Sequence, residues 1–213
     1  MSAPRHHPED DLLIGYASGR LRPIKSLLVA THLAYCPECR TRVGAFEEQC
    51  GAWFEALPAM ADDGLDALLG RLDGMLDTVP AEAPPPPPVP AALSDGGHPP
   101  VPEPLRSWLA RPMDDCTWQT IAPGVSVSTW AEEGAGSKVC LLRMAANAPV
   151  PAHRHTALEM LLVLRGGFAD HDGAYRLGDV ATYAPDTDHH ARADDDGECI
   201  CLFLLDGDIV FLD

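Results

Sequence analysis

Apolar residues in the first 80 positions recur three or four apart, the spacing that places side chains on one face of an α-helix. Acidic residues at 9–11 precede an apolar cluster at 12–16, and Gly19 follows, which predicts a short first helix. A second helix is expected over 23–35, and a third begins at Pro37 because proline suits the first turn of a helix.

The third predicted helix carries apolar side chains along most of its length: Val43, Phe46, Cys50, Trp53, Phe54 and Leu57. This spacing predicts that the stripe, Cys50 included, packs into a core. A fourth helix follows the turn at 62–64 and has a broad apolar face, rich in leucine, between 65 and 79. That face either completes the helical bundle or is offered to a partner.

Proline dominates the segment that follows the helices. Eleven of the 25 residues from Pro80 to Pro104 are proline, the composition of an extended spacer that cannot build a core. We expect a proline-rich linker over 80–104, between a helical domain at 1–79 and a second domain at 105–213. Such a linker would leave the relative orientation of the two domains loosely set.

Beyond the linker the pattern changes to short apolar or alternating runs separated by glycine. The runs expected as strands are 125–130, 138–144, 159–164, 181–183, 199–205 and 209–212. Many short strands without helical spacing between them predict a sandwich or jelly-roll barrel. The expected fold class is therefore α+β in two domains, an all-α helical bundle followed by an all-β barrel.

Composition narrows the possible functions. The 213 residues carry a formal net charge of −17, which argues against direct nucleic-acid binding and suits a basic protein partner. Seven cysteines, an odd number, argue against a secreted disulfide framework. The N-terminus is polar, and no apolar run approaches the about 18 residues of a membrane span. We expect a soluble, cytoplasmic protein without a membrane partner.

A His-x3-Cys-x2-Cys pattern lies at the junction of the second and third helices, at His32, Cys36 and Cys39. Positions four apart share one helix face, and the proline after Cys36 starts the new helix that brings Cys39 to the same corner. These three ligands are one short of the tetrahedral set that zinc prefers. The fourth is expected from His6 or His7, and His7 is preferred because it is closer to the first helix. A structural zinc ion would compensate for the thin core of such short helices.

A second set of metal-ligand residues lies in the strand-rich half. His153 and His155 are two apart, so they point to one side of an extended segment, and Glu159 begins the next strand. A further histidine comes from His189 or His190. Three imidazoles and one carboxylate bind a divalent transition metal, although this ligand set alone does not select which one.

The first third of the chain resembles the zinc-binding anti-sigma domain of regulators that hold extracytoplasmic-function sigma factors inactive. The similarity covers about residues 5–57 and rests on His7, the run from Leu12 to Gly19 and the run from Ala30 to Arg40. The resemblance implies helices that wrap the DNA- and polymerase-contacting domains of a sigma factor. It also implies zinc at the four ligands chosen above.

Residues 105–213 resemble a cupin domain. The first cupin motif, His-x-His-x3-Glu-x6-Gly, is complete from His153 to Gly166. The second departs from the family pattern, because Pro185 is shifted by one position and Thr187 stands where a glycine is usual.

This departure leaves two choices for the last ligand. Counting from Gly178 selects His189, whereas counting from the shifted proline selects His190. We take His189, and the expected cupin metal set is then His153, His155, Glu159 and His189, with zinc as the expected ion.

A zinc-binding helical domain followed by a cupin-like domain resembles the ChrR-type anti-sigma factors, whose known members respond to singlet oxygen or related oxidative stress. The resemblance implies a 1:1 complex with an extracytoplasmic-function sigma factor, inhibition by the helical domain and sensing by the cupin domain. Oxidation at the cupin site, its metal or the Cys199 and Cys201 pair would loosen that complex, although core packing is the default role of these two thiols. No catalytic residue is expected. The alternatives are a metal-dependent cupin enzyme, either a dioxygenase or an isomerase, and a metal-storage or metal-sensing protein.

Overall fold

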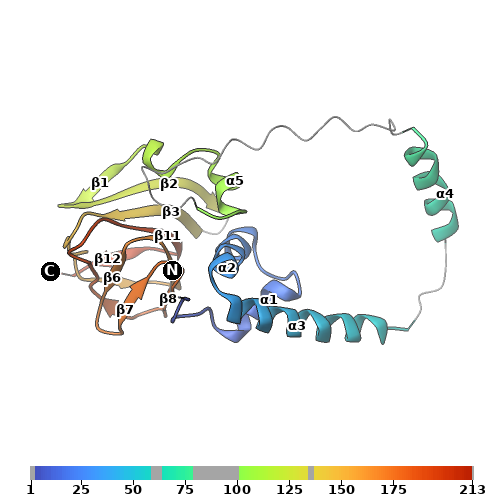
Figure 1. The fold of residues 1–213 in the computed structure, drawn as a ribbon, viewed down its shortest axis with the longest axis horizontal. Helices are drawn as coiled ribbons and strands as arrows, with labels where there is room; N and C mark the ends of the chain where they lie inside the picture. Colours follow the sequence, from blue (N-terminus) through green and yellow to red (C-terminus); the bar gives the residue numbers. More distant parts are fainter. Residues whose placement is uncertain (1–2, 59–63, 79–100, 134–136, 213) are drawn as a thin grey trace.

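The computed structural model describes residues 3–58, 64–78, 101–133 and 137–212, and the structural statements below concern these residues (Figure 1). The helices are α1 (Asp10–Ala17), α2 (Pro23–Tyr35), α3 (Pro37–Glu55), α4 (Leu65–Leu76) and α5 (Leu105–Leu109), with a short 3-10 turn at Met113–Asp115. The strands are β1 (Gln119–Ala122), β2 (Val125–Glu133), β3 (Ser137–Met144), β4 (His153–His155), β5 (Glu159–Arg165), β6 (Gly167–Ala169), β7 (Ala174–Arg176), β8 (Val180–Tyr183), β9 (Asp188–His189), β10 (Arg192–Ala193), β11 (Cys199–Asp206) and β12 (Ile209–Phe211). No helix in these ranges has the length and apolarity needed to cross a bilayer.

The helices begin and end where their proline and glycine signals predict. α2 and α3 each have proline in the first turn. Cys36 between them has an extended backbone, because the following proline disfavours helical geometry at that residue. Gly19 takes a left-handed conformation just after α1. The corner at Cys36 therefore brings the end of α2 against the start of α3.

The strands form three antiparallel sheets rather than one hydrogen-bonded closed barrel. A six-stranded sheet has the order β1-β2-β3-β11-β5-β8, and two three-stranded sheets have the orders β10-β6-β7 and β12-β4-β9. All the expected strands are confirmed within a residue or a few at each end. The strands not among the expected runs are β1, β4, β6, β7, β9 and β10, which are two to four residues long and too short to show alternation in the sequence. We call residues 101–212 the β-domain and residues 3–58 the helical domain.

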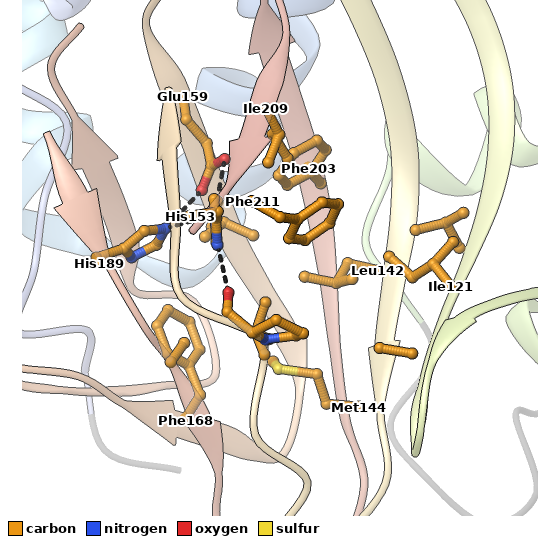
Figure 2. A pocket seen from close by; sticks show the side chains of 16 residues that line it. Ile121, Leu142, Met144, His153, Glu159, Phe168, His189, Phe203, Ile209 and Phe211 are labelled. Carbon is orange, nitrogen blue, oxygen red and sulfur yellow. Dashed lines mark hydrogen bonds and ion pairs between the residues drawn. The ribbon is translucent and has the colours of Figure 1, made fainter. Parts of the chain in front are cut away.

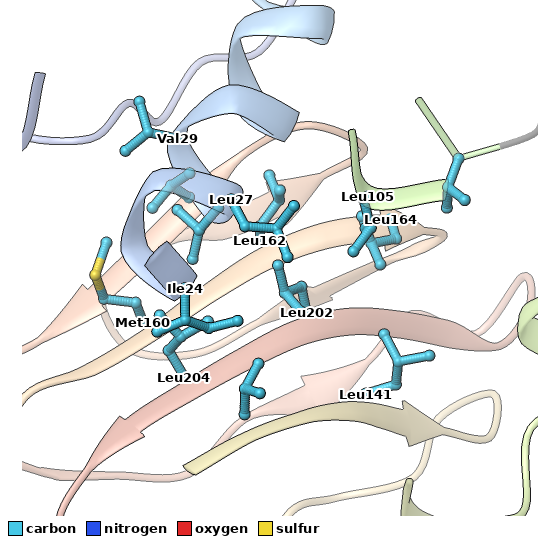
Figure 3. Close-up of a cluster of buried hydrophobic side chains, with 14 of the residues drawn as sticks. Ile24, Leu27, Val29, Leu105, Leu141, Met160, Leu162, Leu164, Leu202 and Leu204 are labelled. Atoms are coloured by element: carbon cyan, nitrogen blue, oxygen red, sulfur yellow. The ribbon is translucent and has the colours of Figure 1, made fainter. Parts of the chain in front are cut away.

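The helical domain packs on the outer face of the six-stranded sheet, and the two share one apolar core (Figure 3). Ile24 and Leu27 of α2 lie against Leu162 of β5 and Leu202 of β11. Val101, which falls within the expected linker, is also buried there. The expectation of a loose orientation between the two halves is therefore wrong for the described residues, because apolar side chains of both halves are removed from water together.

Alternation along β11 divides the apolar side chains between two cores. Ile200, Leu202 and Leu204 belong to the core shared with the helices. Cys199 and Cys201 point to the other side, into a second core formed by the six-stranded sheet and the β10-β6-β7 sheet. This inner core lies next to the second set of candidate metal ligands, because its Tyr183 contacts the rings of His155 on β4 and His189 on β9.

The second half of α3 departs from expectation, because its apolar stripe does not pack into a core. Val43 is buried, but Trp53, Phe54 and Leu57 are 69%, 75% and 63% exposed. Cys50 is half-buried. α4 has no buried residue at all, so of the two alternatives for its apolar face the described structure shows an exposed one.

Candidate metal centres

The corner between α2 and α3 gathers His7, His32, Cys36 and Cys39, which we call the helical cluster. Their ligand atoms all lie within 4.8 Å of one another, so the four side chains could hold a metal ion. His7 Nδ1 is 3.4 Å from the sulfur of each cysteine. His6 is not part of the cluster, since its ring lies against Tyr175 of β7 with the centroids 4.4 Å apart.

The ring of His32 is oriented by the β-domain. Its Nδ1 lies 2.7 Å from the carbonyl oxygen of Gly178, which fixes that nitrogen as the hydrogen-bond donor. Its Nε2 is buried without a hydrogen-bond partner, as expected of a nitrogen whose lone pair is reserved for a ligand. Burial lowers the pKa of His32 to about 4, so the imidazole is neutral at pH 7 and its lone pair is available. Burial and the neighbouring Cys36 raise the pKa of Cys39 to about 12, and the nearby Arg42 guanidinium offsets this rise only in part.

The second group, which we call the β cluster, lies inside the β-domain and consists of His153, His155, Glu159 and His189. Both β4 histidines point inward while Arg154 between them points outward, and β4 pairs with β9 so that His153 is opposite His189. All four side chains are almost completely buried. His190, the alternative to His189, is exposed and lies outside the cluster.

The distances within the β cluster suit a shared cation better than mutual hydrogen bonds. His155 Nε2 and Glu159 Oε2 are 3.0 Å apart, yet neither atom has a hydrogen-bond partner with acceptable geometry. His153 Nε2 and His189 Nε2 are also 3.0 Å apart (Figure 2 shows His153, Glu159 and His189). The His153–His189 contact is a hydrogen bond when one of the two nitrogens is protonated, whereas the unpartnered atoms of His155 and Glu159 are expected where side chains point at one common ion.

Two further residues hold His189 in place. Asp170 Oδ2 lies 3.7 Å from His189 Nδ1, and the hydroxyl of Tyr183 donates to the same carboxylate. Burial opposes ionisation of Asp170, but the nearby His189 imidazole and the hydrogen bond from Tyr183 outweigh it and lower the pKa of Asp170 to about 2. Burial likewise disfavours the charged form of His189, yet Asp170 and Glu159 raise its pKa to about 9. This carboxylate–imidazole pair is the arrangement that orients many metal-binding histidines.

A cavity of about 90 Å³ adjoins the β cluster (Figure 2). His153, Glu159 and His189 contribute to one wall. The remaining lining side chains are apolar: Ile121, Ala122, Val127, Leu142, Met144, Val150, Pro151, Leu161, Phe168, Ala191, Phe203, Ile209 and Phe211. A small uncharged molecule could therefore reach the cluster without losing hydrogen bonds to water.

The sulfur atoms of Cys199 and Cys201 lie close together, but their surroundings disfavour thiol reactivity. The two sulfurs are 3.7 Å apart, and both residues are completely buried in the inner core. The hydrogen bond between them and the burial raise the pKa of Cys201 well above its ordinary value, which disfavours the reactive thiolate. The geometry thus agrees with the default role in core packing.

Sequence reasoning missed the residues that support the ligands. Asp170 and Asp179 come from loops and are joined to the clusters only by the tertiary fold. Gly178 serves in the sequence only as a strand separator and as the counting point of the cupin motif, whereas in the fold it takes the left-handed conformation that glycine permits.

Comparison with known proteins gives consistent results over almost the whole chain. Residues 109–207 match the family model described as the ChrR cupin-like domain. The anti-sigma-E factor ChrR of Cereibacter sphaeroides is 34% identical over 209 residues, which cover 97% of this chain and 92% of that protein. The crystal structure of Rhodobacter sphaeroides SigE in complex with the anti-sigma ChrR matches with a TM-score of 0.74 and 32% identity. That match covers 95% of this chain and 99% of the solved one.

Proposed function

The chain belongs to the ChrR family of anti-sigma factors, and from this premise we propose that it binds and inhibits an extracytoplasmic-function sigma factor in a 1:1 complex. The observation that carries the proposal is the similarity of 95% of the chain, helical domain included, to a protein solved in complex with a sigma factor. We infer that the complex acts in the cytoplasm, where sigma factors meet RNA polymerase.

An exposed apolar surface on α3 and α4 supports this partner. We call it the docking face; its members are Trp53, Phe54, Leu57, Leu65, Leu68, Leu69, Leu72, Met75 and Leu76, each about half exposed or more. The members on α4 recur three or four apart and so share one helix face, and a large exposed apolar face of this kind marks a protein interaction surface rather than ordinary monomer surface. The strongly acidic chain suits a sigma factor, because surfaces that meet promoter DNA are basic.

The helical cluster is proposed to hold zinc through His7, His32, Cys36 and Cys39. Two sulfur and two nitrogen ligands form a set common to structural zinc sites, which leave no coordination position open. The cluster joins the segment before α1 to the α2–α3 corner, so the ion would stabilise the helical arrangement on which the docking face depends.

The β cluster is proposed as the sensing site for oxidative stress, with a divalent metal, zinc being our choice, held by His153, His155, Glu159 and His189. Its support is the apolar cavity beside it, which admits a small uncharged oxidant to a buried polar centre. The completely buried Cys199 and Cys201 pair contributes less to this proposal, since thiols with raised pKa react slowly.

Enzymatic turnover is the competing proposal, because a metal with three histidines and a carboxylate can leave positions open for a substrate. The apolar cavity has no charged group besides the cluster itself to orient such a substrate. We therefore propose a regulator without catalytic residues.

The test is a titration of the purified chain with an extracytoplasmic-function sigma factor of the same organism, followed by light scattering. We expect one complex with the mass of one copy of each protein. Saturable turnover of a small molecule without any complex would overturn the proposal in favour of the enzyme.

A further inference from the structure

Residues of the β-domain contact the helical cluster, and their hydrogen bonds hold both histidines of the cluster or the backbone beside them. The contact is the turn at Gly178–Asp179, immediately before β8. The carbonyl oxygen of Gly178 accepts a hydrogen bond from His32 Nδ1 at 2.7 Å. The histidine on the helical side is thereby held by the backbone of the other domain.

The second histidine is held through the segment 4–7, which we call the N-terminal arm. The side chain of Asp179 accepts hydrogen bonds from the backbone nitrogens of Arg5, at 2.6 Å, and His6, at 3.0 Å, both through Oδ1. The carbonyl oxygen of His6 in turn accepts from the backbone nitrogen of Val180, at 3.1 Å. All three bonds are made by Arg5 and His6, the two residues immediately before His7.

Asp179 is well placed for this role. It is 1% exposed, and its other oxygen, Oδ2, accepts from the backbone nitrogen of Arg176 at 2.8 Å. One carboxylate thus ties its own β-turn to the N-terminal arm. A buried carboxylate satisfied in this way costs much to remove, because the donors left behind lose their partners.

Gly178 is required by the same close approach. Its backbone has φ of +87°, and a Cβ built there would lie 2.8 Å from Cβ of Tyr35 and 2.9 Å from Cγ of Pro4. The turn is therefore wedged between the end of α2 and the N-terminal arm. No side chain fits at this position without moving one of the two elements that carry the histidines.

We propose that Asp179 and the Gly178 carbonyl are positioning groups for the helical cluster, so that its metal affinity depends on β8 of the β-domain. The inference rests on the metal role proposed above for that cluster. The opposite end of β8 carries Tyr183, whose ring lies 3.9 Å from that of His189 in the β cluster. A single four-residue strand thus joins the surroundings of the two candidate centres.

The experiment measures cobalt binding to the full-length chain. Cobalt bound by thiolates gives a sulfur-to-metal charge-transfer band in the near ultraviolet, and of the candidate metal clusters among the described residues only the helical cluster contains cysteine. Competition with a chelator then reports the affinity of the helical cluster alone. The variants are Asp179→Ala and Asp179→Asn, and the matched control is Asp206→Ala.

Asp206 is a suitable control because it lies at the same interface and joins the two domains through residues other than the N-terminal arm. It accepts hydrogen bonds from Arg22 and Ser137 and forms an ion pair with Lys25 at 2.8 Å. Its removal loosens the contact between the two domains without touching the N-terminal arm.

We expect Asp179→Ala to weaken cobalt binding at the helical cluster about 10- to 100-fold, the usual effect of losing a group that orients metal ligands. Asp179→Asn should lie between the wild type and this variant, because the amide oxygen can still accept from the arm. Asp206→Ala should bind as the wild type does.

Equal affinities in the wild type and both Asp179 variants would overturn the positioning role. So would an equal loss in Asp206→Ala, which would assign the effect to the interface in general. If the wild type itself gives no thiolate band, the failure belongs to the proposed metal site. Should Asp179→Ala not fold, Asp179→Asn decides the question by the same measurement.

Discussion

Phe54, near the end of α3, offers the sharpest separation of binding from folding. Its side chain is 75% exposed in the free chain, and α3 is already formed there. Replacement by alanine removes apolar surface from the docking face and leaves the helix intact, since alanine is the best helix former. We therefore expect Phe54→Ala to change sigma-factor affinity and nothing else.

The size of the effect follows from the area that the partner can cover. A phenylalanine presents about 150–250 Å². Three quarters of that area, at about 25 cal/mol per Å², corresponds to roughly 3–5 kcal/mol if the partner covers all of it. Coverage of about half leaves roughly 1.5–2.5 kcal/mol, which raises the dissociation constant about 10- to 60-fold.

Calorimetric or surface-based titration with the sigma factor measures the change, and thermal unfolding of the free variant checks the fold. The matched control is Val210→Ala, which removes a half-exposed apolar side chain of β12, outside the docking face. Unchanged affinity in Phe54→Ala, or the same loss of affinity in Val210→Ala, would refute the claim that the docking face binds the sigma factor. A lowered unfolding temperature in Phe54→Ala would instead refute the claim that the side chain is dispensable for folding.

Four further outcomes follow from the structure. Leu28→Ala in the shared core should lower the free energy of unfolding by about 2–5 kcal/mol, and urea transitions followed by helical and β-domain probes should shift together. Burial opposes ionisation of Asp206, but hydrogen bonds from Lys25 and Ser137 outweigh burial and lower the pKa of this carboxyl group. The stabilisation of the folded state by the Asp206 carboxylate is therefore present at pH 7 and is lost as the pH falls below about 4. The difference in urea midpoint between the wild type and Asp206→Asn should accordingly shrink between pH 7 and pH 3. Glu159→Ala should keep sigma-factor binding but abolish release under oxidative stress, measured with a sigma-dependent reporter; normal induction would contradict the sensing proposal. Chelation of the helical-cluster metal should weaken sigma-factor binding in the same titration, and the addition of zinc should restore it.

Much of the local structure could be predicted because its signals are local. Pro23 and Pro37 mark the starts of α2 and α3, and the structure has both helices beginning there. In the fold His7 lies in the helical cluster, while His6 is directed toward Tyr175, so His7 as the zinc ligand stays a prediction that the grouping allows. His189 was selected by its distance from Gly178, and β9 pairing with β4 brings it opposite His153.

The relation between the two halves could not be predicted in the same way. Apolar residues such as Leu27 read equally well as the core of a separate bundle or as one side of an interface. The partner side of that interface is the outer face of β5 and β11, which are buried on both faces and show no alternation to mark it. The role of Asp179 also depends on tertiary contacts that leave no local pattern, since its partners in the N-terminal arm are backbone nitrogens more than 170 positions away.

For the α3 part of the docking face, the sequence predicted a buried core where the structure has an exposed surface. Its apolar spacing on α3 is the same whether the helix packs in its own chain or against a partner, so periodicity alone predicted a core. Only the exposure of these side chains in the fold distinguishes a partner-facing stripe from a core stripe: Trp53 is 69% exposed, and Phe54 and Leu57 are exposed as well. A surface built to be covered by another protein has the sequence pattern of an interior.

Transcription by RNA polymerase and the cognate extracytoplasmic-function sigma factor, measured in vitro with increasing amounts of the purified chain, tests the central claim most directly. The account predicts that transcripts from a sigma-dependent promoter disappear as the chain approaches one copy per sigma factor, while transcripts made with the housekeeping sigma factor persist. Undiminished transcription at a several-fold excess of metal-loaded chain would contradict it.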